Sequence, residues 1–310
     1  MVARYSIIVL LALSLFGCGS ASVSPTPASP SEAPATPTVS QPATSTAIPD
    51  YVTEIRNAQY QLGATDALRV VSLKDGKFEQ GTPGGADYVS VNVTDFVSAG
   101  DLNGDNKSEV VALVAENYGG SGVFTFLAVY ADVNGTLAFE TSALVDDRPS
   151  LKAMSVQNGE IFLDAVIHAS DDPLCCPTLR INRHYRLVTG NQLDMTDYST
   201  FTPDGRPRII TIEAPADGTE VYGSLQMRGR VSIAPFENNL AYRVYDTGGV
   251  ELGSGSITVT ATDLGGPGTF NQVVALGNIL SGALVRVEVQ DISAKDGSLL
   301  AMDSVELVVK

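Results

Sequence analysis

Nine residues in the first half of the chain have the oxygen-rich spacing of a cation-binding loop. Asp101, Asn103 and Asp105 alternate with other residues, and Glu109 stands at the ninth position, directly before an apolar run. Ca²⁺ prefers such local oxygen ligands, with a backbone carbonyl near position seven, here Lys107. The spacing therefore predicts a Ca²⁺ site, although the strand-like run that follows excludes an EF-hand. The alternative is a plain turn in which the same side chains bond to the backbone.

A second group of reactive side chains comprises Cys175 and Cys176, with His168 before them and His184 after them. Outside the cytoplasm free thiols tend to oxidise, and each cysteine of the pair has its neighbour as the available intramolecular partner. We therefore expect a vicinal disulfide. A redox site or a Cys/His metal site is a weaker alternative, because both usually have spaced cysteines. Intermolecular pairing also stays open.

The sequence contains no hydrolase signature. No serine stands in a Gly-x-Ser-x-Gly elbow, and Gly119–Gly122 leads into a strand without the lysine of a phosphate loop. We expect a non-catalytic binding or scaffold protein. The alternative is an exported redox or glycan-active enzyme centred on His168, Cys175, Cys176 and His184.

The amino terminus has the pattern of an export signal. An uncharged apolar run follows Arg4 and ends at Phe16. It is shorter than the ~20 residues that span a bilayer, but it fits the apolar region of a signal peptide over residues 1–17. Residues 18–50 are rich in Pro, Ser, Thr and Ala, which predicts an extended, disordered tether.

The end of this signal, Leu15-Phe16-Gly17-Cys18, resembles the lipobox of bacterial lipoproteins. The resemblance implies lipidation of the Cys18 sulfur and an extracytoplasmic protein anchored to a bacterial membrane. Two or three acyl chains anchor a protein stably, whereas one does not.

Composition limits the partners of the folded part. Acidic residues number 35 against 19 basic ones, for a net charge of −16, so nucleic acid is excluded as a partner. About 260 residues follow the tether, which is more than one core usually serves. We expect an envelope protein or a glycan as the ligand.

The first predicted domain covers residues 51–201. Val52, Ile55 and Leu62 could share one face of a helix over residues 51–62, capped by Asp50. Branched and aromatic runs then predict strands at 68–73, 88–93, 110–115, 123–130, 161–167 and 179–187. Turn pairs between them are Asp75-Gly76, Asn134-Gly135, Asn158-Gly159 and Gly190-Asn191. The domain is expected to be mainly β, or α+β.

Turn-forming residues 202–207 mark a linker, and residues 208–310 follow as a second domain. Seven short strands are predicted there, at 209–212, 225–231, 240–245, 255–260, 269–274, 284–290 and 305–309. Their number and spacing are typical of an immunoglobulin-type β-sandwich.

Several motifs in order, from Ile212-Glu-Ala-Pro215 through Phe236-Glu237-Asn-Asn-Leu240 to Ser293-Ala-Lys-Asp-Gly-Ser298, resemble the immunoglobulin-like domain of bacterial spore germination proteins. The resemblance implies an accessory or binding module without catalysis. Within it we expect Phe236 to be a core anchor and Glu237 a strand-edge charge.

Two further resemblances concern the first domain. The Cys175-Cys176-Pro177 element, downstream of Gly119–Gly122 and Asp146-Asp147-Arg148, resembles LppP/LprE-type lipoproteins of actinobacteria, which supports the location more than an activity. The loop from Asp101 to Glu109 resembles the calcium loops of FG-GAP repeats, but a single copy does not support a propeller.

Overall fold

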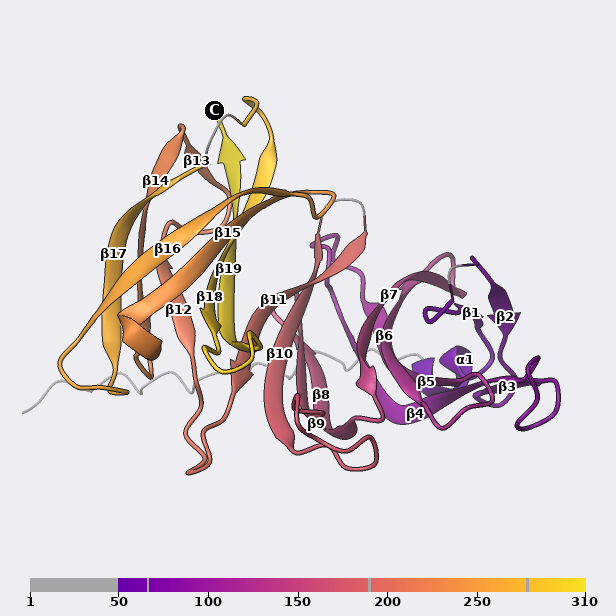
Figure 1. Ribbon diagram of the computed structural model, residues 1–310. Coiled ribbons are helices and arrows are strands. Elements are labelled where there is room, and N and C mark those ends of the chain that lie inside the picture. Colours follow the sequence, from indigo (N-terminus) through magenta and orange to yellow (C-terminus); the bar gives the residue numbers. More distant parts are fainter. Residues whose placement is uncertain (1–49, 66, 189–190, 277–278) are drawn as a thin grey trace, which may run out of the picture. The chain divides into compact units, whose positions relative to one another are not determined.

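The computed structural model describes residues 50–65, 67–188, 191–276 and 279–310 (Figure 1). The predicted signal peptide, Cys18 and the tether up to residue 49 lie outside the described residues. Strands dominate the described part, which confirms a mainly β fold.

The first sheet has five antiparallel strands and is covered on both faces. Across the sheet the strands are β3 (Lys77–Gln80), β4 (Val89–Gly100), β5 (Glu109–Asn117), β6 (Phe124–Asp132) and β7 (Leu137–Asp147). In β5, Val110 and Val114 face one apolar core, whereas Val111 and Leu113 face another. Because both faces of the strand are buried, its sequence is a continuous apolar run and does not alternate.

One face of this sheet is covered by α1 (Tyr51–Ile55) and by the hairpin of β1 (Gln59–Gln61) and β2 (Val70–Ser72). Asp50 caps the helix as predicted, since its Oδ1 accepts a hydrogen bond from the backbone N–H of Thr53 at 3.2 Å. The helix therefore starts where the sequence places it.

The predicted extent of this helix, residues 51–62, is wrong. The helix ends at Ile55, and β1 pairs with β2 in place of a further helical turn. Tyr60 of β1 is fully buried, and its hydroxyl donates to the Glu116 carboxylate at 2.6 Å. The long-range contacts of Tyr60 thus override the helical spacing of the apolar residues.

The opposite face of the first sheet packs on four antiparallel strands. They are β8 (Ser150–Gln157), β9 (Glu160–Ile167), β10 (Leu179–Val188) and β11 (Gln192–Thr200). Ile161 and Leu163 of β9 point into the shared core, and burial alternates along the strand. Phe162 and Asp164 therefore lie on the outer face of this second sheet.

Three predicted hairpin turns are confirmed. Asp75-Gly76, Asn134-Gly135 and Asn158-Gly159 each have positive φ at both residues. This is the twist-compatible conformation of a two-residue hairpin, which Asn-Gly and Asp-Gly favour. In the fourth pair, Gly190 lies outside the described residues.

The last hundred residues form an immunoglobulin-like β-sandwich with the seven predicted strands. One sheet contains β12 (Ile210–Ala214), β14 (Ser224–Val231) and β17 (Gly268–Ala275), and the other contains β15 (Asn239–Asp246), β18 (Leu284–Ile292) and β19 (Leu299–Val309), with the short β13 (Thr219–Val221) beside β19. The long strand β16 (Glu251–Ala261) pairs first with β15 and then with β17, so it belongs to both sheets (Figure 1). A core that includes Leu240, Val287 and Leu307 lies between them.

Strand β11 also pairs with β19, so the sheet of β8 to β11 continues into β19, β18 and β15. The predicted linker, residues 202–207, is a tight turn in which the Thr202 N–H donates to the Arg206 carbonyl at 2.9 Å. All described strands belong to one contact unit, Ile48–Lys310. The division into domains 51–201 and 208–310 stays a prediction.

Candidate functional site

The predicted Ca²⁺ loop connects β4 to β5 and is built around Asp101. Its Oδ1 accepts the Gly104 N–H at 2.7 Å, and its Oδ2 accepts the Asn106 N–H at 2.8 Å. Gly104 and Asn106 both have positive φ, which glycine and asparagine adopt more readily than other residues. Asp101 therefore closes the loop through two backbone bonds.

The other predicted ligands are engaged in the same way. Asn103 Oδ1 accepts the Asp105 N–H at 2.9 Å, and Asp105 Oδ1 accepts the Lys107 N–H at 2.8 Å. Glu109 is buried, and its Oε2 accepts the Leu102 N–H at 2.7 Å. Burial raises the pKa of the Glu109 carboxyl, and repulsion by Asp105 adds to this effect.

These hydrogen bonds within the loop are enough to hold it as a turn without a metal ion. Within the described ranges, no group of three His, Cys, Asp or Glu side chains has the geometry to hold a metal ion. Each carboxylate oxygen has a second lone pair, so the backbone bonds do not themselves exclude a cation. The Ca²⁺ site stays a prediction.

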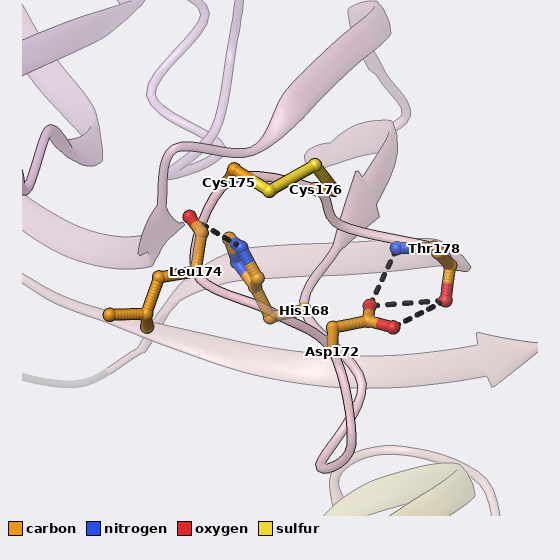
Figure 2. Close-up of a disulfide and its surroundings, with 6 residues drawn as sticks. All are labelled: His168, Asp172, Leu174, Cys175, Cys176 and Thr178. Atoms are coloured by element: carbon orange, nitrogen blue, oxygen red, sulfur yellow. Dashed lines mark hydrogen bonds between the residues drawn. A yellow bond between two sulfur atoms is a disulfide. The ribbon is translucent and has the colours of Figure 1, made fainter.

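The cysteine pair lies on the loop between β9 and β10 (Figure 2). Cys175 and Cys176 are joined by a disulfide, and both are exposed. Asp172 closes this loop, because its Oδ2 accepts the backbone N–H groups of Ala169 at 2.8 Å and Thr178 at 2.7 Å. These hydrogen bonds lower the pKa of Asp172.

The His168 side chain contacts the same loop next to the disulfide. Its Nε2 is 3.2 Å from the Leu174 carbonyl oxygen (Figure 2). Its backbone N–H donates to Asp146 Oδ2 at 2.9 Å. The imidazole thus has a structural partner on the loop, and its Nδ1 lies 3.4 Å from Asp146 Oδ2. This arrangement positions the loop more than it prepares a proton transfer.

His184 lies elsewhere, on the outer face of β10. It pairs in register with Phe162, and their ring centroids are 4.2 Å apart. His168 follows Phe162 by six residues, which corresponds to ~20 Å along a strand. Burial lowers the pKa of His184, which disfavours its charged form. The structure therefore does not bring His184 together with His168 and the cysteine pair.

The cleft beside His184 is shallow. Its volume is about 210 Å³, below the ~300–1,000 Å³ of typical ligand pockets. Ser155, Asp164 and Asn182 complete its polar lining. The cleft is open to solvent, so it lacks the enclosure that general acid or base chemistry favours.

Sequence reasoning missed three acidic residues, the half-buried Asp197 and Asp303 and the fully buried Glu116. Asp197 of β11 and Asp303 of β19 are register partners where the two strands pair. Glu116 is fully buried in β5. Four groups donate to its carboxylate: the hydroxyls of Tyr60 and Tyr118 and the backbone N–H groups of Gly63 and Ala64. The sequence could have drawn attention to Glu116, because it is an acidic residue in an otherwise apolar strand.

The prediction that Phe236 anchors the core is wrong, because its side chain is 67% exposed. The turn before β15 has positive φ at Glu237 and Asn238, and this conformation keeps Phe236 outside the sandwich.

Comparison with known families agrees with the second half of the structure. Residues 209–298 match the model of the immunoglobulin-like domain of bacterial spore germination. No curated protein matches the chain. Among the described residues, no helix has the length and apolar character to cross a membrane.

Proposed function

We propose that the protein is an exported lipoprotein, tethered to a bacterial membrane through Cys18, that acts as a non-catalytic binding or scaffold protein of the cell envelope. The observation that carries the proposal is the spore-germination-type immunoglobulin-like domain over residues 209–298. The lipobox-like Leu15–Cys18 and the Pro-rich segment after it support the tether.

The geometry of the first half supports binding over catalysis. The residues of the enzymatic alternative lie on two separate surfaces, and His184 borders a shallow cleft. Binding sites tolerate open, shallow surfaces, whereas catalytic groups need mutual hydrogen-bond reach.

The direct test is crosslinking in intact envelopes followed by co-purification. Wild type and the His184→Ala variant should enrich the same envelope partners, because the proposal gives His184 no catalytic role. The Cys18→Ser variant, released from the membrane, should lose them. Equal recovery from wild type and from Cys18→Ser would contradict a tethered binding protein.

A further inference from the structure

The turn before β15 holds a large apolar ring in solvent. Phe236 begins a short 3-10 turn after Pro235, and the Asn238 N–H closes it by donating to the Pro235 carbonyl at 3.0 Å. Glu237 and Asn238 both have φ of 55°. Non-glycine residues adopt this left-handed conformation rarely, and such strain gathers at functional sites.

A groove of about 300 Å³ lies beside this ring. Small side chains line part of it, Ala241 from β15 and its register partner Ser256 from β16. Phe236 lies at one border, and Ile292 lies at another part of the lining.

The groove also presents polar groups that are free to bind. The side chains of Glu237 and Asn239 line it, and among the described residues neither makes a hydrogen bond or an ion pair. The Ser256 hydroxyl is free in the same sense. An exposed aromatic ring therefore stands next to a carboxylate, an amide and a hydroxyl without protein partners.

We propose that this groove binds a neutral oligosaccharide of β-linked pyranose rings. The apolar face of one ring stacks on Phe236, and its hydroxyls bond to Glu237, Asn239 and Ser256. This inference rests on the proposed binding function and narrows its ligand to a class.

Charge and topology argue against other ligands. Glu237 and the net charge of −16 repel anions. Strand addition by an extended peptide requires a free sheet edge. Strand β15 is paired on both sides, with β16 and β18. Strand β16 pairs with β17 only from Val259 onward. Beside the groove its other edge is occupied by the Gln272 side chain, which donates to the Ser256 carbonyl at 2.7 Å and accepts the Thr258 N–H at 3.0 Å. A sugar needs only a stacking surface and scattered polar groups.

The test is calorimetric titration of the full-length protein in detergent with cellotetraose and with chitotetraose. At least one should bind. Phe236→Ala should weaken binding at least about tenfold, because it removes the stacking surface. The melting temperature should stay unchanged, since the ring packs on no core. Tyr222→Ala removes another exposed aromatic of the same sandwich, 71% exposed, and should leave the affinity unchanged.

The proposal is overturned if neither sugar binds, or if Phe236→Ala binds like wild type. It is also overturned if envelope crosslinking shows a protein partner that Phe236→Ala alone loses, because the groove would then be a protein-docking surface. Either failure leaves the tethered binding function in place, since loss of envelope partners on Cys18→Ser is measured independently of any sugar.

Discussion

Replacing Asp197 by Asn is expected to make the protein more stable above neutral pH. Asp197 and Asp303 are register partners in the pairing of β11 with β19. Burial, together with repulsion by Asp303 and Glu160, raises the pKa of Asp197 to about 7. Burial likewise raises the pKa of Asp303 to about 6. Two ionised carboxylates facing each other would therefore destabilise this pairing.

Other groups around the pair modify its titration. Asp303 accepts backbone N–H groups from Ile212 at 2.7 Å and Ser304 at 2.8 Å, and both bonds favour its ionised form. Arg186 also favours the ionised form of Asp303, whereas Asp217 opposes it. His184 is the register partner of Asp197 on the other side. Asp303 therefore loses its proton at a lower pH than Asp197. Its negative charge then raises the pKa of Asp197.

The raised pKa of Asp197 fixes the direction in which the free energy of unfolding changes with pH. Below pH ~4 the carboxyl of Asp197 is protonated in both the folded and the unfolded chain, so its contribution is fully present. Between pH ~4 and ~7 the unfolded chain loses this proton first, so the free energy of unfolding falls as pH rises. A pKa raised from 3.8 to about 7 corresponds to ~4 kcal/mol, at ~1.4 kcal/mol per pH unit. The carboxyls titrate as a pair, so the values for Asp197 and Asp303 are not added.

Asp197→Asn removes this loss while keeping the side-chain volume. Among the described residues the Asp197 side chain makes no hydrogen bond that the change would break, and the backbone pairing with His184 and Asp303 is kept. Urea unfolding between about pH 4.5 and pH 8 measures the effect. The gain of the variant over wild type should rise from ~1 kcal/mol at pH 4.5 to ~4 kcal/mol at pH 8. Asp95→Asn, at an exposed position of β4, is the matched control and should show no such gain. A difference between Asp197→Asn and wild type that stays constant with pH would refute the reasoning.

Three further predictions concern the first half of the chain. Mass spectrometry of the unreduced native protein should find no free thiol at Cys175 or Cys176, and alkylation of both cysteines would contradict the disulfide. Saturating Ca²⁺ should raise the melting temperature by ~5–10 °C, since a hundredfold excess over Kd adds ~2.7 kcal/mol. EDTA should reverse this rise and Asp101→Ala should abolish it, whereas an unchanged transition would leave the loop a plain turn. Glu116→Gln should cost ~2–4 kcal/mol in urea unfolding, because four donors then face one oxygen and an amide. Glu79→Gln, which changes an exposed acceptor of one tyrosine hydroxyl, should cost far less, and equal losses would contradict the role of Glu116.

The immunoglobulin-like half was predictable because its strands alternate. Ser224–Val231 shows strict alternation of exposed and buried residues, and branched residues fill the buried positions of its neighbours. By contrast, β11 (Gln192–Thr200) was missed because it contains Gln, Asp, Thr and Ser. Its burial comes from pairing with β10 and β19, which local sequence does not report.

The candidate sites also differ in whether local sequence can locate them. The loop from Asp101 to Glu109 and the Cys175-Cys176 pair are contiguous in sequence, so spacing alone could locate them. Asp197 and Asp303 meet only through the register of β11 with β19. Phe236 was assigned to the core because its residue type favours burial, whereas the positive φ of the next two residues places it outside.

The most direct test of the tethered lipoprotein is membrane fractionation of cells grown with radiolabelled fatty acid. Wild-type protein should carry the label, sediment with membranes and be digested by protease added outside the cytoplasmic membrane. The Cys18→Ser variant should lose the label and appear in the soluble fraction. If Cys18→Ser remains in the membrane fraction, or if wild type carries no label, the anchor assigned to Cys18 is wrong.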